Sequence, residues 1–269
     1  MNKSIIAVAA AAVLAGVGGW YYWARQQQRH AVAVPAPAAS VAPVGAPPSA
    51  PPAIHYPVPS GNASGISASA ALPALEDSDP SLREALGTVI GADAVKAMLS
   101  ANDLVRRIVV TVDNLARAKL PVDRLPVPGP SGAFLVAGDA QHATIDPRNY
   151  ARYAPYVDLL RRLDMHALAG VYFRFYPLFE QVYRGLGYPD GYFNDRLIAV
   201  IDLLLATPQP QGPIELIQPH VQYEFADPKL EALSSGQKVL LRIGPDNASL
   251  VKAKLAELRA ALTASPPPR

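Results

Sequence analysis

Two serine–lysine pairs are the residues whose types and spacing come closest to a nucleophilic site. Ser235–Lys238 and Ser249–Lys252 both read Ser-x-x-Lys, the spacing with which penicillin-binding enzymes attack a lactam or a peptide. The Lys-Thr-Gly motif that accompanies such a serine is missing, and so is Gly-x-Ser-x-Gly. We therefore interpret both pairs as ordinary helix-end serines beside surface lysines and predict no catalytic residue.

Asp190 and Asp195 form a second candidate, because they lie among Tyr188, Tyr192 and Phe193. Glycosidases need two carboxyl groups facing one bond, so a hydrolase of glycan or peptide is the alternative function. Tyr-Pro-Asp-Gly, however, is typical of a turn, and an acidic residue is favourable at a helix start. The candidate partner-binding residues are Tyr188, Tyr192 and Asp195.

Aromatic residues are concentrated in the same part of the chain. Of 20 aromatic residues, 12 lie between Tyr150 and Phe193. A helix that is apolar on every side is normally buried, so core packing is the first interpretation. A groove for a glycan or protein partner is the second, since tyrosine combines a stacking surface with a polar hydroxyl.

Metal and nucleotide sites have no support in the sequence. There is no cysteine, and His142, His166 and His220 are far apart in the folded region, whereas a closed zinc site needs four ligands. Glycine-rich phosphate-binding motifs are also missing. We predict no cofactor and no metal.

The net charge of +2 has to be divided along the chain. Lys3, Arg25 and Arg29 are the only charged residues before Glu76, so the first part carries +3 and the rest is slightly acidic. The folded region lacks the basic surface of a nucleic-acid-binding domain, and we predict no nucleic-acid partner.

Residues 5–23 are an uncharged apolar run that ends in Trp20, Tyr21, Tyr22 and Trp23. As a helix the run would be about 28 Å long, close to the hydrocarbon thickness of a bilayer, and aromatic residues favour the bilayer interface. We predict a membrane anchor in residues 1–30 that contacts the lipid bilayer through residues 5–23. A cleaved signal peptide, with a late site near Ala31, is the alternative.

Residues 31–71 are predicted to be a disordered linker. Nine prolines and nine alanines lie between Ala31 and Ser60, a composition that excludes helices and central strands and favours extended conformations. A spacer across the envelope is one interpretation of this stretch and a passive tether is the other. His55-Tyr56 in its middle is a candidate for a short docking element. We expect a single-pass protein of a bacterial inner membrane with its folded domain in the periplasm.

The folded domain is predicted over residues 72–262, followed by a disordered tail over residues 263–269. Its expected fold class is mainly α (α+β), a multi-helix domain with a small antiparallel sheet or hairpins. Residues 134–137 and 142–145 are expected to form a hairpin, and residues 214–217 and 221–225 are two further expected strands. Pro177 predicts a kink or break in a long helix. The expected helix caps are Asp79, Asn102, Asp146, Asp164, Asn194 and Asp227.

Three segments carry a resemblance to a known family. They are residues 103–117 (DLVRRIVVTVDNLAR), residues 187–193 (GYPDGYF) and residues 236–255, which begin GQKVLLRIGPDN. Together they resemble the bacterial family called domain of unknown function 3014. The resemblance implies a single-span membrane protein with one soluble domain, and it brings no activity or ligand. We therefore expect a non-enzymatic binding or scaffolding module for an envelope protein or cell-wall material.

Overall fold

The computed structural model describes residues 53–59, 72–99, 102–139 and 141–264. The predicted anchor, residues 5–23, lies outside the described residues, and so does most of the predicted linker. Within the described ranges no helix is both long and apolar enough to cross a membrane.

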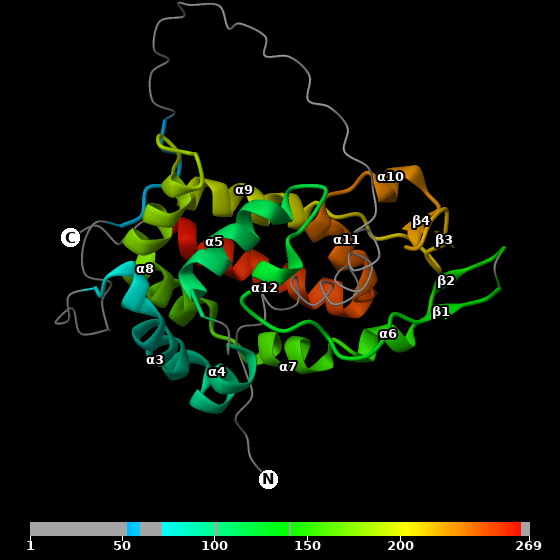
Figure 1. Cartoon of the computed structure of the whole chain (residues 1–269), viewed down its shortest axis with the longest axis horizontal. Helices are drawn as coiled ribbons and strands as arrows, with labels where there is room; N and C mark the ends of the chain where they lie inside the picture. The colour runs from blue at the N-terminus through cyan, green and yellow to red at the C-terminus, as the bar shows by residue number, and fades with distance from the viewer. Residues whose placement is uncertain (1–52, 60–71, 100–101, 140, 265–269) are drawn as a thin grey trace, which may run out of the picture.

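Helix dominates the described part of the chain (Figure 1). Ten α-helices span Ser78–Ile90 (α3), Ala92–Met98 (α4), Leu104–Leu115 (α5), Arg148–Ala151 (α6), Ala154–Arg162 (α7), Met165–Gly185 (α8), Phe193–Leu205 (α9), Pro228–Glu231 (α10), Ser235–Arg242 (α11) and Pro245–Thr263 (α12). The mainly helical prediction is confirmed.

The core lies where α8 and α12 pack against α5, α9 and α3 (Figure 1). Helix α8 buries residues on several sides, including Val171, Phe175 and Phe179, because α12, α5 and α3 all contact it. This explains its high apolar and aromatic content. Most of the aromatic cluster predicted for this region is therefore core.

Local signals mark both ends of α8. The carboxylate of Asp164 accepts hydrogen bonds from the backbone N–H groups of His166 and Ala167 at 2.8 and 3.2 Å, which is the predicted cap. The helix ends at Gly185, and Gly187 has a positive φ of 103°. Of the kink or break predicted at Pro177, the break is wrong, because α8 continues through that residue.

Three other predicted caps differ from expectation. Asp79 lies in the first turn of α3, yet its carboxylate accepts the backbone N–H groups of Asp103 and Leu104 at 2.9 and 2.8 Å. Asp79 therefore caps α5, and the predicted cap at Asn102 is wrong. The structure also begins α9 at Phe193 and places the predicted cap Asn194 inside its first turn.

Two short antiparallel hairpins form the small β structure. Strands Val136–Ala137 (β1) and Thr144–Ile145 (β2) pair with each other, as do Leu216–Ile217 (β3) and Glu224–Phe225 (β4). A bridge between Thr144 and Glu215 joins the two hairpins. All four predicted strands and the first predicted hairpin are confirmed, with shorter strands than expected, and the two hairpins enclose a second apolar cluster around Ile145 and Phe225.

Candidate functional site

The turn between α8 and α9 is held by a carboxylate from the preceding helix. Glu180 of α8 accepts hydrogen bonds from the Tyr176 hydroxyl at 2.7 Å and from the backbone N–H of Phe193 at 2.8 Å. It thereby caps the first turn of α9, where the free N–H groups and the helix dipole favour a negative charge. Burial, and after it the hydrogen bond to Glu180, raises the pKa of Tyr176 far above its ordinary value, so this hydroxyl stays protonated.

Asp195, also in the first turn of α9, binds the backbone of a distant segment. Its Oδ2 accepts the N–H of His55 at 2.9 Å, and its Oδ1 accepts the N–H of Tyr56 at 2.8 Å. Residues 53–59, here called the docked segment, lie beside the α8–α9 turn as the blue trace of Figure 1. They fall inside the predicted linker and form neither helix nor strand.

Two further side chains complete the recognition of this backbone. The Tyr192 hydroxyl accepts the N–H of Val58 at 2.7 Å, and the Asn194 side-chain amide donates to the carbonyl of Tyr56 at 2.8 Å. Pro57 has no N–H. Every backbone donor from residue 55 to residue 58 is therefore bonded to a side chain of α9 or of its N-cap.

The Tyr56 side chain gives the contact its aromatic anchor. Its ring is half-buried and packs against the main core, and the guanidinium carbon of Arg259 on α12 lies 5.9 Å from the ring centre. Arg259 is itself held by Asp202 at 2.5 Å, and this hydrogen bond raises the pKa of Arg259 above its ordinary value. We call Tyr192, Asn194, Asp195 and Arg259 the docking site.

Asn194 connects the docking site to the interior. It is fully buried, and its carbonyl oxygen accepts the hydroxyl of Tyr172 at 3.1 Å. Burial raises the pKa of Tyr172 well above its ordinary value, so this hydroxyl is a permanent donor. The amide oxygen of Asn194 is bonded to Tyr172 in the interior, and the amide nitrogen is bonded to the Tyr56 carbonyl of the docked segment. These two bonds together fix the orientation of the amide.

Of the three predicted partner-binding residues, the structure brings together Tyr192 and Asp195 and places Tyr188 elsewhere. Tyr188 stacks on Tyr183 with ring centres 4.6 Å apart, and its hydroxyl donates to Asp113 at 3.3 Å. Asp113 is buried on α5 and also pairs with Arg117 and Arg196 at 2.7 and 3.0 Å. Tyr188 therefore fastens the α8–α9 turn to α5 rather than contacting the docked segment.

The serines and lysines of the two Ser-x-x-Lys pairs bond to other residues and not to each other. The Ser235 hydroxyl donates to the Asn114 carbonyl at 2.9 Å, while Lys238 pairs with Glu231. The Ser249 hydroxyl donates to the Pro245 carbonyl at 2.9 Å. Burial lowers the pKa of Lys252, but its ammonium donates to the carbonyl of Thr207.

The remaining acidic and histidine candidates are exposed or already hydrogen-bonded. Asp190 is exposed, and Asp195 is already bonded to two backbone amides. His142 and His166 are exposed beside Asp139 and Asp164. No group of three or more His, Cys, Asp or Glu side chains in the described ranges is arranged to hold a metal ion.

Sequence reasoning missed Asn194 and Arg259 as members of the site and gave Tyr56 only a minor place. The available signal was the pattern of residues 55–59, in which an aromatic residue is followed by two spaced prolines. Proline favours an extended backbone with few free donors, the form that a row of acceptor side chains can bind. Nothing in the sequence says which face of the domain receives it.

Comparison with known proteins gives one match. Neither the curated proteins nor the solved structures contain a match to this chain. The sequence model of one family matches residues 104–259, more than half of the chain. The matched region includes Tyr192, Asn194, Asp195 and Arg259 but not the docked segment. The chain therefore belongs to the family described as "Protein of unknown function (DUF3014)".

Proposed function

We propose that this protein is a non-enzymatic, membrane-anchored envelope module whose docking site binds an extended protein segment. The observation that carries the proposal is the complete bonding of the backbone donors of residues 55–58 by Asp195 and Tyr192. A side-chain row that binds backbone groups can accept more than one sequence, as long as the ligand is extended. An aromatic residue followed by proline is the ligand pattern that the docked segment itself supplies.

The chain's own segment acts as a resident ligand in this proposal. A ligand joined to its site by a short flexible linker has an effective concentration in the millimolar range, and residues 60–71 belong to the linker that the sequence predicts. A partner segment therefore has to compete with the docked segment. Release of residues 53–59 would lengthen the tether between the anchor and the domain.

A peptide with the sequence of residues 53–59 tests the docking site directly. It is labelled with a fluorophore and titrated into the full-length chain, and binding is followed by fluorescence anisotropy. The double variant Tyr56→Ala with Val58→Pro disables the segment in cis, because it removes the aromatic anchor and one backbone donor. We expect this variant to bind the peptide at least tenfold more tightly than the unmodified chain.

Two controls give that titration its meaning. Adding Asp195→Ala to the disabled variant should abolish binding, because the acceptor of two N–H groups is gone. A peptide carrying the same Tyr56→Ala and Val58→Pro changes should bind at least tenfold more weakly than the native peptide. The proposal is contradicted if the disabled variant does not bind the peptide at millimolar concentration. It is also contradicted if Asp195→Ala leaves the affinity for the peptide unchanged.

The envelope part of the proposal rests on residues 5–23, which lie outside the described residues, and is tested separately. A C-terminal fusion to alkaline phosphatase is active only after export, whereas a fusion to a cytoplasmic fluorescent protein reports the opposite orientation. We expect phosphatase activity in the membrane fraction and no fluorescence. The reverse result would place the domain on the cytoplasmic side.

A further inference from the structure

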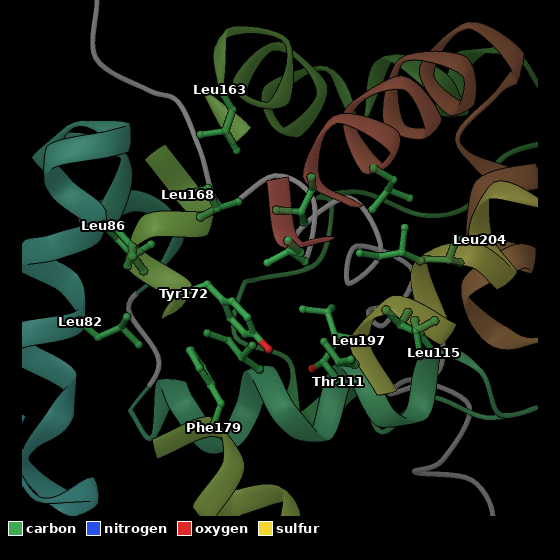
Figure 2. A pocket seen from close by; sticks show the side chains of 18 of the residues that line it. Leu82, Leu86, Thr111, Leu115, Leu163, Leu168, Tyr172, Phe179, Leu197 and Leu204 are labelled. Carbon is green, nitrogen blue, oxygen red and sulfur yellow. The ribbon is translucent and has the colours of Figure 1, made fainter. Parts of the chain in front are cut away.

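A partly open cavity of about 170 Å³ lies among the core helices (Figure 2). Its walls come from α3, α5, α8, α9 and α12, and from Leu99 and Leu163 beside them. Eleven of its 19 lining residues are leucines, and all but Thr111 and Tyr172 have wholly apolar side chains. No charged side chain lines it.

The size and lining of this cavity define what can occupy it. Protein interiors normally hold few voids larger than a water molecule. An engineered apolar cavity of about 150 Å³ in another protein stays dry and binds benzene. A cavity of similar volume and lining is large enough for a single six-membered ring and too small to enclose a long acyl chain. A charged molecule would lose its hydration without gaining a partner.

The Thr111 hydroxyl is an unsatisfied polar group in the wall of this cavity. Thr111 of α5 is 1% exposed, and its Oγ1 has no hydrogen-bond partner among the described residues. A threonine inside a helix commonly satisfies its hydroxyl on the carbonyl one turn earlier, so an orphaned one is unusual. In Figure 2 the Tyr172 hydroxyl is directed towards the side of the cavity that Thr111 and Leu197 occupy. Its proton is already donated to Asn194.

We propose that the cavity is a binding site for a small neutral molecule with a benzene-sized apolar body and one hydrogen-bonding oxygen, which bonds to Thr111. Phenol is the simplest member of this class. The apolar body fills the space between the leucines, and its hydroxyl supplies the missing partner of Thr111 Oγ1. The site is separate from the docking site, and the proposal stands without the proposed function.

The first experiment compares phenol with benzene, which has the same ring and no oxygen. Isothermal titration calorimetry of the full-length chain gives both affinities, and their ratio cancels effects that the two probes share. Thr111→Val keeps the shape of the side chain but removes the hydroxyl. We expect Thr111→Val to lower the phenol-to-benzene affinity ratio at least fivefold, with benzene still bound. An unchanged ratio, or no saturable binding of either probe to the unmodified chain, overturns the proposal.

The second experiment locates the bound probe in the unmodified chain and so does not depend on any variant folding. Leucine methyl groups are labelled with ¹³C, and their NMR shifts are followed as phenol is added. We expect saturable shifts at Leu197 and Leu204, which line the cavity, and none at Leu186, which is exposed and outside it. Shifts confined to exposed methyl groups would show surface binding and overturn the proposal.

A filled variant completes the test. Leu197→Phe adds volume to the cavity wall and should abolish the binding of both probes. If Leu197→Phe folds and still binds phenol with the original affinity, the proposal is wrong. If it does not fold, the methyl shifts and the Thr111→Val ratio decide.

Discussion

Asp195 Oδ1 accepts the backbone N–H of Tyr56 at 2.8 Å, although the two residues are 139 positions apart in the chain. The second oxygen of the same carboxylate accepts the preceding N–H, that of His55. Hydrogen bonds to charged groups are worth about 1.5–3 kcal/mol each when buried; here the site is half-exposed, and the lower end applies. The carboxylate therefore holds residues 53–59 against the domain more strongly than a neutral acceptor in its place would.

Asp195→Ala should release the docked segment and leave the domain folded. Both N–H acceptors disappear, so the amides of residues 55 and 56 should exchange with solvent at least tenfold faster. Hydrogen–deuterium exchange of the peptide that covers residues 53–59, read by mass spectrometry, measures this. Asp190→Ala is the matched control, because Asp190 is exposed and should leave exchange unchanged. Equal exchange in all three proteins would contradict the assignment.

Tyr192→Phe and Tyr188→Phe should have opposite profiles. Tyr192→Phe removes the acceptor of Val58 N–H, so exchange of residues 53–59 should rise while the free energy of unfolding changes by less than about 1 kcal/mol. Tyr188→Phe removes a hydroxyl that bonds Asp113, so the free energy of unfolding should fall by about 1 kcal/mol with exchange of the segment unaltered. Urea denaturation and hydrogen–deuterium exchange on the same samples give both numbers. Similar profiles for the two variants would show that Tyr188 belongs to the docking site after all.

The features that could be predicted from the sequence are those whose partners are close along the chain. Asp164 caps the helix that follows it, and both hairpins pair segments separated by short turns. Such contacts leave a pattern within one window of sequence. The predicted mainly helical fold with hairpins rests on signals of this kind.

Two carboxylates whose partners could not be predicted share a different property. Asp79 and Asp195 both stand at a helix start, and the local rule assigns each carboxylate to its own helix. In the structure Asp79 accepts the N–H of Asp103, which is 24 residues away in the chain. Asp195 accepts the N–H of His55, which is 140 residues away. A carboxylate near a helix start shows that a hydrogen-bond acceptor is present. Its position in the sequence does not tell which N–H group will bond to it. The same ambiguity hid which segment Asp195 binds.

The cap at Asp164 should make stability depend on pH. The backbone N–H groups of Ala167 and His166 lower the pKa of Asp164 below its ordinary value. A carboxyl whose pKa is lower in the folded than in the unfolded chain stabilises the fold fully above the unfolded value, about pH 4. That contribution is lost as the pH falls through the folded value.

Asp164→Ala should therefore cost about 1 kcal/mol at pH 7, and the difference from the unmodified chain should shrink below about pH 4. Urea denaturation at several pH values between 3 and 7 measures the difference. Asp164→Asn is the control, because asparagine caps helices as well as aspartate does and has no proton to gain. A pH-independent penalty for Asp164→Ala would show that the carboxylate is not the capping group.

Asn194 and Tyr172 should be energetically coupled. Asn194→Ala leaves two groups without partners, the Tyr172 hydroxyl inside and the Tyr56 carbonyl outside, and should cost about 2–3 kcal/mol of unfolding free energy. Tyr172→Phe removes the orphaned hydroxyl, so the double variant should be more stable than the sum of the single changes predicts, by about 1 kcal/mol. Urea denaturation of the four proteins gives this coupling energy.

Tyr156→Phe provides the matched comparison for that cycle. The Tyr156 hydroxyl bonds the carbonyl of Pro128 at 3.0 Å and shares no partner with Asn194, so its combination with Asn194→Ala should be additive within about 0.5 kcal/mol. Additivity in both cycles would mean that the Tyr172–Asn194 bond contributes nothing. Coupling with Tyr172 alone means that a side chain lining the central cavity helps to orient the amide that holds the Tyr56 carbonyl. Tyr172→Phe by itself should then also speed exchange of residues 53–59, although Tyr172 has no hydrogen bond to that segment among the described contacts.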